Sequence, residues 1–262
     1  MRKHILFAGL LLVLKMATAQ HAISSEEALA TANRIETVTN SGDAGMLDHF
    51  IYIDSLIGNM RQKSRAMKDP AFLRGFSESF SKSFINYGQR IMVSIQLGNY
   101  RLLREYESKG VRHLVFRMFG SGGLNYHDYT LVRVKDSIKA SDVYIYSIDE
   151  ALSSNLATLA DMMNNSAESL PEDVSILIKM TDMGNKKNYA GVKEQFEKLD
   201  VKYRNSKSLQ LIYISACHHI DNALYESALE HFASGFPDAP SAYLMMTDLY
   251  YLRKEKIGRA HV

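Results

Sequence analysis

The chain has a single cysteine, no concentrated block of basic residues, and no apolar run long enough to cross a bilayer. Cys217 has no second cysteine with which to form an internal disulfide. Without a basic run or an Arg-rich stripe, nucleic acid is a poor candidate partner. The sequence also lacks a serine nucleophile elbow and a His-Glu-x-x-His motif. We therefore expect no cofactor and no metal, and the absences favour a non-enzymatic protein.

The first nineteen residues have the three-part layout of a cleaved secretory signal. A basic start at Arg2-Lys3-His4 precedes the apolar run Ile5–Leu14, and Ala17-Thr18-Ala19 supplies the small residues before a cleavage site. The run is shorter than the ~20 residues that a bilayer span needs. We predict that residues 1–19 are removed and that the protein is exported to the periplasm or outside the cell, without a membrane span. An uncleaved anchor is the alternative.

The last residues have an unusual origin. Ile257-Gly258-Arg259-Ala260-His261-Val262 is the translation of ATCGGAAGAGCACACGTC, one frame of a common sequencing adapter. We therefore expect residues 256–262 to be an artefact and the natural chain to continue past Glu255. Of the 31 Lys and Arg, five lie in the two terminal segments, and 31 minus five leaves 26 against 29 Asp and Glu. The mature chain is thus slightly acidic.

The N-terminal third predicts helices. Ser24 and Glu27 form a capping-box pattern, so a helix should begin there and run to about Ser41. A second helix is expected from Asp43 to Ile57. A third should begin at Asp69-Pro70 and carry an apolar stripe to Ile95 at steps of three or four. That stripe indicates a core face or the wall of a ligand site.

A period of two then replaces the helical period. Strands are expected at 100–107, 111–119, 124–134 and 142–148, with turns at 108–110 and 120–123. Helices followed by such a meander indicate an α+β domain over residues 24–168. The layout resembles the nuclear-transport-factor-2-like or cystatin-like class, in which helices pack on a curved antiparallel sheet. The run from Phe116 to Tyr129 resembles uncharacterised exported proteins of double-membraned bacteria.

Beyond Pro171 the pattern is helical and repeats. Tyr189, Val192 and Phe196 recur as Tyr225, Ala228 and Phe232, each 36 positions later. Residues 171–255 resemble tetratricopeptide repeats, which have a period near 34 and a small residue four positions before an aromatic residue. The resemblance implies stacked helix pairs with a concave binding surface. Candidate partner-binding residues in the first helices are Gln210, Tyr213 and His218.

Two sets of polar residues are candidates for a chemical role. Tyr126 and Asp128 share one face of the predicted strand, near Arg117 on the neighbouring strand, and together they are the candidate ligand-binding residues. Cross-strand polar pairing is the alternative. Cys217-His218-His219 cannot converge on one metal ion, because consecutive helical side chains spread by about 100°. Cys217 is therefore expected to be a small buried residue.

Two functions remain open. The first is an exported scaffold or interaction module whose helical repeats bind a protein or peptide partner in the cell envelope. The rival is a small-ligand-binding, less plausibly catalytic, cone-shaped α+β domain supported by the helices. An open cavity between the Phe72–Ile95 stripe and the sheet would favour the rival, whereas aromatic rings filling that space would favour the first.

Overall fold

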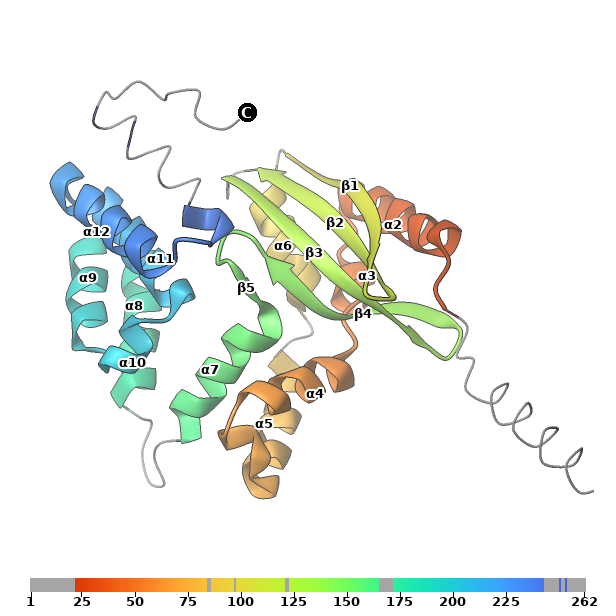
Figure 1. Ribbon diagram of the computed structural model, residues 1–262, viewed down its shortest axis with the longest axis horizontal. Helices are drawn as coiled ribbons and strands as arrows, with labels where there is room; N and C mark the ends of the chain where they lie inside the picture. The colour runs from red at the N-terminus through yellow and green to blue at the C-terminus, as the bar shows by residue number, and fades with distance from the viewer. Residues whose placement is uncertain are drawn as a thin grey trace, which may run out of the picture. The chain divides into compact units, whose positions relative to one another are not determined.

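The computed structural model describes residues 22–83, 86–96, 98–120, 123–164, 172–242, 250 and 253. Within these residues the chain is a mixed α+β protein with one five-stranded sheet (Figure 1). Its residues cluster into two compact units. Unit 1 comprises residues up to Ile53 with Phe84–Leu124 and Asp128–Asp142, and unit 2 comprises Asp54–Ser83, Asn125–His127 and the chain from Val143 onward. The predicted signal, the border at Pro171 and the predicted adapter tail lie outside the described residues.

The helices of unit 1 are α2 (Ser25–Asn40), α3 (Gly45–Asp48) and α6 (Tyr87–Ile95). The predicted capping box is confirmed: the Ser24 hydroxyl accepts the backbone N–H of Glu27, and the Glu27 carboxylate accepts the backbone N–H of Ser24. The predicted single helix from Asp43 to Ile57 is wrong. The chain is extended at Ile51, which pairs with Ala140 as an isolated bridge, and this pairing separates α3 from the next helix.

The sheet is a meander of β1 (Asn99–Ser108), β2 (Val111–Gly120), β3 (Gly123–Val134), β4 (Ser137–Ile145) and β5 (Glu150–Ala151), paired in that order. The β1–β2 turn is Lys109-Gly110, with φ of 52° and 77°, the two positive angles that a tight hairpin turn needs. The last long strand starts at Ser137 rather than at the predicted 142. The reason is a two-residue turn at Lys135-Asp136, where Lys135 has a φ of 53° without the usual Asn or Gly.

Aromatic rings fill the core of unit 1. Tyr100 stacks on Phe116 with ring centres 4.8 Å apart, and Phe50 meets Tyr129 edge to face at 5.2 Å. The Tyr129 hydroxyl lies 2.8 Å from that of Tyr100 and 2.9 Å from that of Tyr87. Helix α2 packs against β1 and β2, and α6 packs against β2, with Ile35 and Ile91 among their buried residues. The hydroxyl chain gives each of these buried polar atoms a partner, as burial requires.

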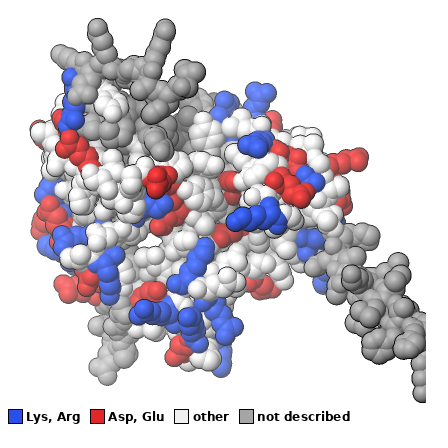
Figure 2. Space-filling view, in the orientation of Figure 1, with Lys and Arg blue, Asp and Glu red and all other residues white. Residues whose placement is uncertain are grey.

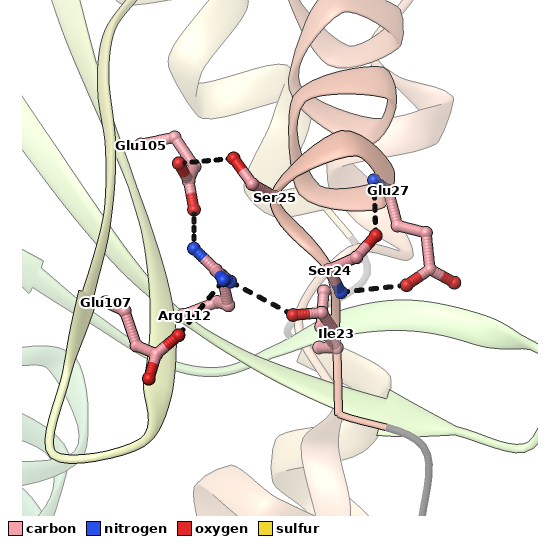
Figure 3. A network of polar contacts seen from close by, with 7 residues as sticks. All are labelled: Ile23, Ser24, Ser25, Glu27, Glu105, Glu107 and Arg112. Carbon is pink, nitrogen blue, oxygen red and sulfur yellow. Dashed lines mark hydrogen bonds and ion pairs between the residues drawn. The ribbon is translucent and has the colours of Figure 1, made fainter.

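A polar network ties α2 to the β1–β2 hairpin at the edge of unit 1 (Figure 3). Arg112 on β2 donates to the Glu105 carboxylate at 2.6 Å, pairs with Glu107 at 3.0 Å, and donates to the Ile23 carbonyl. Ser25 at the start of α2 donates to the other oxygen of Glu105. One guanidinium thus joins both strands to the chain entering α2.

Unit 2 begins with α4 (Ile53–Lys63), the 3₁₀ turn η1 (Ala66–Lys68) and α5 (Pro70–Ser83), which pack with α7 (Leu152–Asn164). Asp161 of α7 accepts from the Ser64 hydroxyl at 2.6 Å and from the Ala66 N–H at 2.9 Å. The predicted continuous helix over Asp69–Ile95 is wrong, because α5 and α6 are separate helices. Its stripe serves two cores: Phe72 and Phe76 pack with Met60, Met67 and Ala160 in unit 2, whereas Tyr87, Ile91 and Ile95 are buried in unit 1.

The remaining helices are α8 (Glu172–Asn185), α9 (Tyr189–Lys198), α10 (Val201–Arg204), α11 (Lys207–His218) and α12 (Asn222–Gly235). Helix α8 packs on α9, α9 on α11, and α11 on α12 (Figure 1). Val192 and Phe196 are buried in one cluster, and Ala228 and Phe232 in the next. Cys217 is fully buried, as expected. No described helix is long and apolar enough to cross a membrane.

Candidate functional site

Unit 2 contains an apolar groove of about 700 Å³ along α7, α8 and α11. Its walls are aliphatic side chains with a few hydroxyl and amide groups. None of its lining residues is charged, although acidic and basic side chains are interspersed over much of the face shown in Figure 2. We call this hollow the α8–α11 groove. It can accept apolar, uncharged groups, since a charge placed there would lose its hydration without gaining a counter-ion.

The two main walls of the α8–α11 groove use equivalent positions of two helices. Four lining residues of α8 have a counterpart 34 positions later in α11: Val174 with Ser208, Leu177 with Leu211, Ile178 with Ile212, and Thr181 with Ser215. This spacing is the period expected of a helix-pair repeat. The second helices α9 and α12 carry the 36-residue correspondence instead.

Two isoleucines make the groove an open apolar surface. Ile178 is 55% exposed and Ile212 is 45% exposed, at corresponding positions of the two walls. Fully burying an Ile side chain contributes about 1.5–3 kcal/mol, so covering two half-exposed ones would contribute of that order to binding. Single exposed apolar residues are common, whereas these two occupy corresponding positions of one groove.

A second, smaller pocket of about 420 Å³ lies among α9, α10, α11 and α12. Two of the predicted partner-binding residues, Gln210 and Tyr213, line it rather than the α8–α11 groove. Tyr213 stacks on Phe196 at 4.5 Å, and burial raises the pKa of its hydroxyl to about 12. The third predicted residue, His218, is exposed and lines neither hollow, with its ring edge against Tyr225. The sequence therefore placed these three residues on one helix but could not assign them to one surface.

The predicted ligand-binding residues of the sheet have separate partners. Asp128 accepts from the Tyr106 hydroxyl at 2.5 Å and lies 3.0 Å from Nδ1 of His113. Arg117 donates instead to the side-chain oxygen of Asn99. Tyr126 belongs to unit 2, where its ring meets Tyr146 edge to face at 5.9 Å.

The contacts of Asp128 join three neighbouring strands. His113 and Tyr106 are directly paired across β1 and β2, and their rings stack at 4.7 Å. A carboxylate at Nδ1 orients an imidazole as in acid–base sites. Here, however, the other carboxylate oxygen accepts from the Tyr106 hydroxyl. The contacts among Asp128, His113 and Tyr106 therefore match the alternative interpretation, polar pairing between neighbouring strands. Sequence reasoning missed His113, because its proximity to Asp128 depends on strand register.

His127, next to Asp128 in sequence, belongs to a different environment. It is buried, and its Nε2 lies 3.3 Å from the Asn125 side-chain amide. Burial lowers the pKa of His127 to about 4, so the ring is neutral at neutral pH. The alternation of strand side chains thus keeps the two apart, as the sequence indicated.

A buried charged cluster was also missed. Asp149 is fully buried, accepts a short hydrogen bond from the Tyr144 hydroxyl, and lies 3.1 Å from Nζ of Lys207. The backbone of Asp149 has a φ of 52°, a region that Asp tolerates better than most residues. Burial and the contact with Asp149 raise the pKa of Tyr144 above its usual value, and burial raises the pKa of the neighbouring Glu150. Lys207 begins α11, so this cluster fixes one end of a groove-lining helix.

Among the described residues no group of three or more His, Cys, Asp or Glu side chains is placed to hold a metal ion. Comparison of the chain with models of protein families, with curated proteins and with solved structures gave no match.

Proposed function

We propose that the protein is a non-enzymatic interaction module whose tetratricopeptide-like helices bind a helical segment of a partner protein in the α8–α11 groove. The observation that carries this proposal is the pairing of Ile178 with Ile212 at equivalent, half-exposed positions 34 residues apart. A groove with regularly repeated apolar positions matches a ligand with regularly spaced apolar side chains. An amphipathic helix, with anchors at steps of three and four, is such a ligand.

The uncharged walls set the chemistry of the occupant. The face that enters the groove should be aliphatic, with small polar groups opposite Thr181 and Ser215. Charged residues of the partner helix should remain outside. If the predicted signal at residues 1–19 operates, the partner lies in the cell envelope. The mature chain would then begin at Gln20, which a mass measurement of the purified exported protein checks.

Site-specific photo-crosslinking tests the groove. A benzophenone amino acid is introduced at Ile178, and at Val93 as the matched control, since Val93 is 67% exposed but lines neither hollow. Illumination of cells producing the full chain should join position 178, but not position 93, to one partner. The joined peptide, identified by mass spectrometry, should carry apolar residues at helical spacing. Equal labelling at both positions would contradict the proposal.

The cone-shaped ligand-binding domain is the alternative that the sequence left open. Tyr100 packs on Phe116 and Phe50 packs on Tyr129, so these rings occupy the space over the sheet. This packing favours the interaction module over a ligand-binding α+β domain. Of the residues that would anchor a ligand there, Asp128 already accepts from Tyr106 and lies against His113. Arg117 donates to Asn99 through a terminal nitrogen, and its Nε is buried with no partner among the described residues.

A further inference from the structure

The side of β1 and β2 that points away from the core of unit 1 carries arginines and apolar side chains. Side chains alternate along a strand, so the neighbours of the buried Tyr100 and Phe116 point away from the core. Glu105 belongs to the core side, where it accepts from Ser25 of α2 (Figure 3). We call the opposite surface the β1–β2 outer face, and it comprises Arg101, Leu103, Arg104, Val115, Arg117 and Phe119.

Two arginines of the outer face lie directly opposite each other. Arg101 of β1 pairs in register with Arg117 of β2, and like charges at such a pair destabilise a sheet. Arg117 donates to Asn99, whereas Arg101 is exposed and has no hydrogen-bond or ion-pair partner among the described residues. The Arg104 guanidinium lies 4.8 Å from the centre of the Tyr106 ring and forms no ion pair within the described part of the chain. The sheet thus carries three positive charges on one face, at a cost to its own stability.

The acidic side chains near this face are engaged elsewhere. Glu105 and Glu107 point to the core side of the sheet, where both pair with Arg112 (Figure 3). Asp128 of β3 lies on the outer side, but it is buried and its two oxygens contact side chains of β1 and β2. The arginines of the outer face therefore remain available to carboxylates of another molecule.

Exposed apolar side chains accompany the arginines. Leu103, which a β-bulge inserts into β1, is 50% exposed, and Phe119 is 53% exposed. Arginine and aromatic residues are enriched at the centres of protein–protein interfaces, where Lys and Glu are depleted, and the outer face contains neither Lys nor Glu. Segments that attract an anionic membrane have clusters of roughly four to eight basic residues, more than this face offers. The composition thus favours a protein partner with acidic side chains.

We infer that the β1–β2 outer face binds an extended acidic segment of a partner protein. Arg101 and Arg117 form one cationic row across the two strands, and Arg104 begins the next row beside Val115. Successive rows are two residues apart, which is roughly 7 Å. An extended segment with acids at alternate positions has the same spacing, and each carboxylate can accept two hydrogen bonds from a guanidinium. An apolar residue two positions before the first acid would contact Phe119.

This surface is separate from the α8–α11 groove. All its residues belong to unit 1, and none of them lines the groove. The acidic segment and the helical segment would therefore occupy different parts of the chain, and each can be tested without the other.

A synthetic peptide tests the outer face. Acetyl-Gly-Leu-Thr-Asp-Thr-Asp-Gly-amide carries the expected pattern, and the same peptide with Asn at both acidic positions is its uncharged control. Each peptide is titrated into the full chain by calorimetry at about 10 mM and about 150 mM salt, at which the Debye length is ~30 Å and ~8 Å. We expect saturable binding of the acidic peptide, a higher Kd at the higher salt concentration, and at least about tenfold weaker binding of the Asn peptide.

Paired variants locate the binding site. Arg101→Gln with Arg104→Gln should weaken binding of the acidic peptide about tenfold, since it removes two exposed guanidinium groups. Arg34→Gln with Arg90→Gln is the matched control, because it removes the same charge from exposed positions of α2 and α6 and should change the affinity less than about twofold. Arg101→Glu should abolish binding and raise Tm by ~1–4 °C, since it places a carboxylate opposite Arg117.

Several results would overturn the acidic-segment site. One is the absence of saturable binding of the acidic peptide, and another is equal affinity for the Asn peptide, both measured on the unchanged chain. Equal losses in the two paired variants would show attraction to net charge rather than to this face. If the acidic peptide does not bind but the chain sediments with vesicles of phosphatidylglycerol and phosphatidylcholine through Arg101 and Arg104, the face binds lipid instead. None of these results bears on the groove, because crosslinking at position 178 should be the same in Arg101→Gln with Arg104→Gln as in the unchanged chain.

Discussion

The two units of this protein bury their apolar side chains in different ways. In unit 1, Tyr100 of β1 stacks on Phe116 of β2, which meets Tyr129 of β3 edge to face. The Tyr87, Tyr100 and Tyr129 hydroxyls form hydrogen bonds with one another inside the core. In unit 2, the helices pack in pairs and leave an apolar groove and a polar pocket between them. A sheet covered by helices on one face can bury its apolar side completely, whereas stacked helix pairs retain a concave surface. Under the function proposed above for the α8–α11 groove, the core of unit 1 supplies stability and unit 2 supplies recognition of the helical partner.

The largest expected effect sharpens this comparison in unit 1. Phe116→Ala removes a fully buried ring that contacts both Tyr100 and Tyr129, and we expect a loss of about 3–5 kcal/mol in the free energy of unfolding. Denaturant unfolding measures the loss. Phe119→Ala, three residues along the same strand and 53% exposed, should change stability by no more than about 0.5 kcal/mol. Similar losses in the free energy of unfolding for the two variants would show that the ring at position 116 is no better packed than the exposed ring at position 119.

The next effect concerns the charged cluster of unit 2. Lys207→Met removes the cation beside the fully buried Asp149 and leaves that carboxylate with Tyr144 as its hydrogen-bond donor. We expect a loss of about 3 kcal/mol, at the lower end for a broken buried pair because Lys207 is 26% exposed. Lys186→Met, which breaks the exposed pair with Asp182, should cost less than about 0.5 kcal/mol in the same unfolding experiment.

A third experiment can break the comparison. A neutral apolar dye, N-phenyl-1-naphthylamine, should show enhanced emission in the presence of the folded chain because the α8–α11 groove is open. Ile178→Lys with Ile212→Lys should abolish the enhancement, since it places two charges on the apolar walls, while Val93→Lys, at a 67% exposed position that lines neither hollow, should not. An unchanged signal in the double variant would locate the open apolar surface elsewhere.

The smallest effect lies at the surface of unit 1. The hydrogen bonds from Arg133 and from the Ser24 N–H lower the pKa of Glu27 from 4.5 to about 2. The stabilisation that this carboxylate provides is therefore present above pH 4.5 and lost as the pH falls towards 2. Arg133→Gln should raise the pKa of Glu27 while leaving it below 4.5, because the capping contact persists. Carbon-detected NMR titration of the Glu27 carboxyl measures this change.

The sequence predicted those features that depend on neighbouring residues. The capping box at Ser24 and Glu27, the hairpin turn at Lys109-Gly110 and the burial of Cys217 all follow from local patterns. The prediction failed where one periodic pattern contributed to two different cores. The stripe from Phe72 to Ile95 has a continuous helical period, but its two halves pack in different cores, and no periodicity reveals that division.

The candidate sites were predictable only in part for a related reason. The position of Gln210 on a repeat helix followed from the pattern, but its orientation into a pocket depends on how α11 packs against α9 and α12. The contact of His113 with Asp128 requires the register of three strands, and that of Lys207 with Asp149 joins residues 58 positions apart. Such contacts arise from tertiary packing, which a single sequence does not display.

The 34-residue correspondence of the groove walls has an evolutionary consequence. A wall built from equivalent positions can be lengthened by duplicating one helix pair, with no redesign of the existing contacts. Each duplication would add one more apolar position in line with Ile178 and Ile212. The longer groove would then contact a longer segment of a partner. If the groove binds a helical partner as proposed, its selectivity for partner length depends on the number of helix pairs as well as on substitutions in the walls.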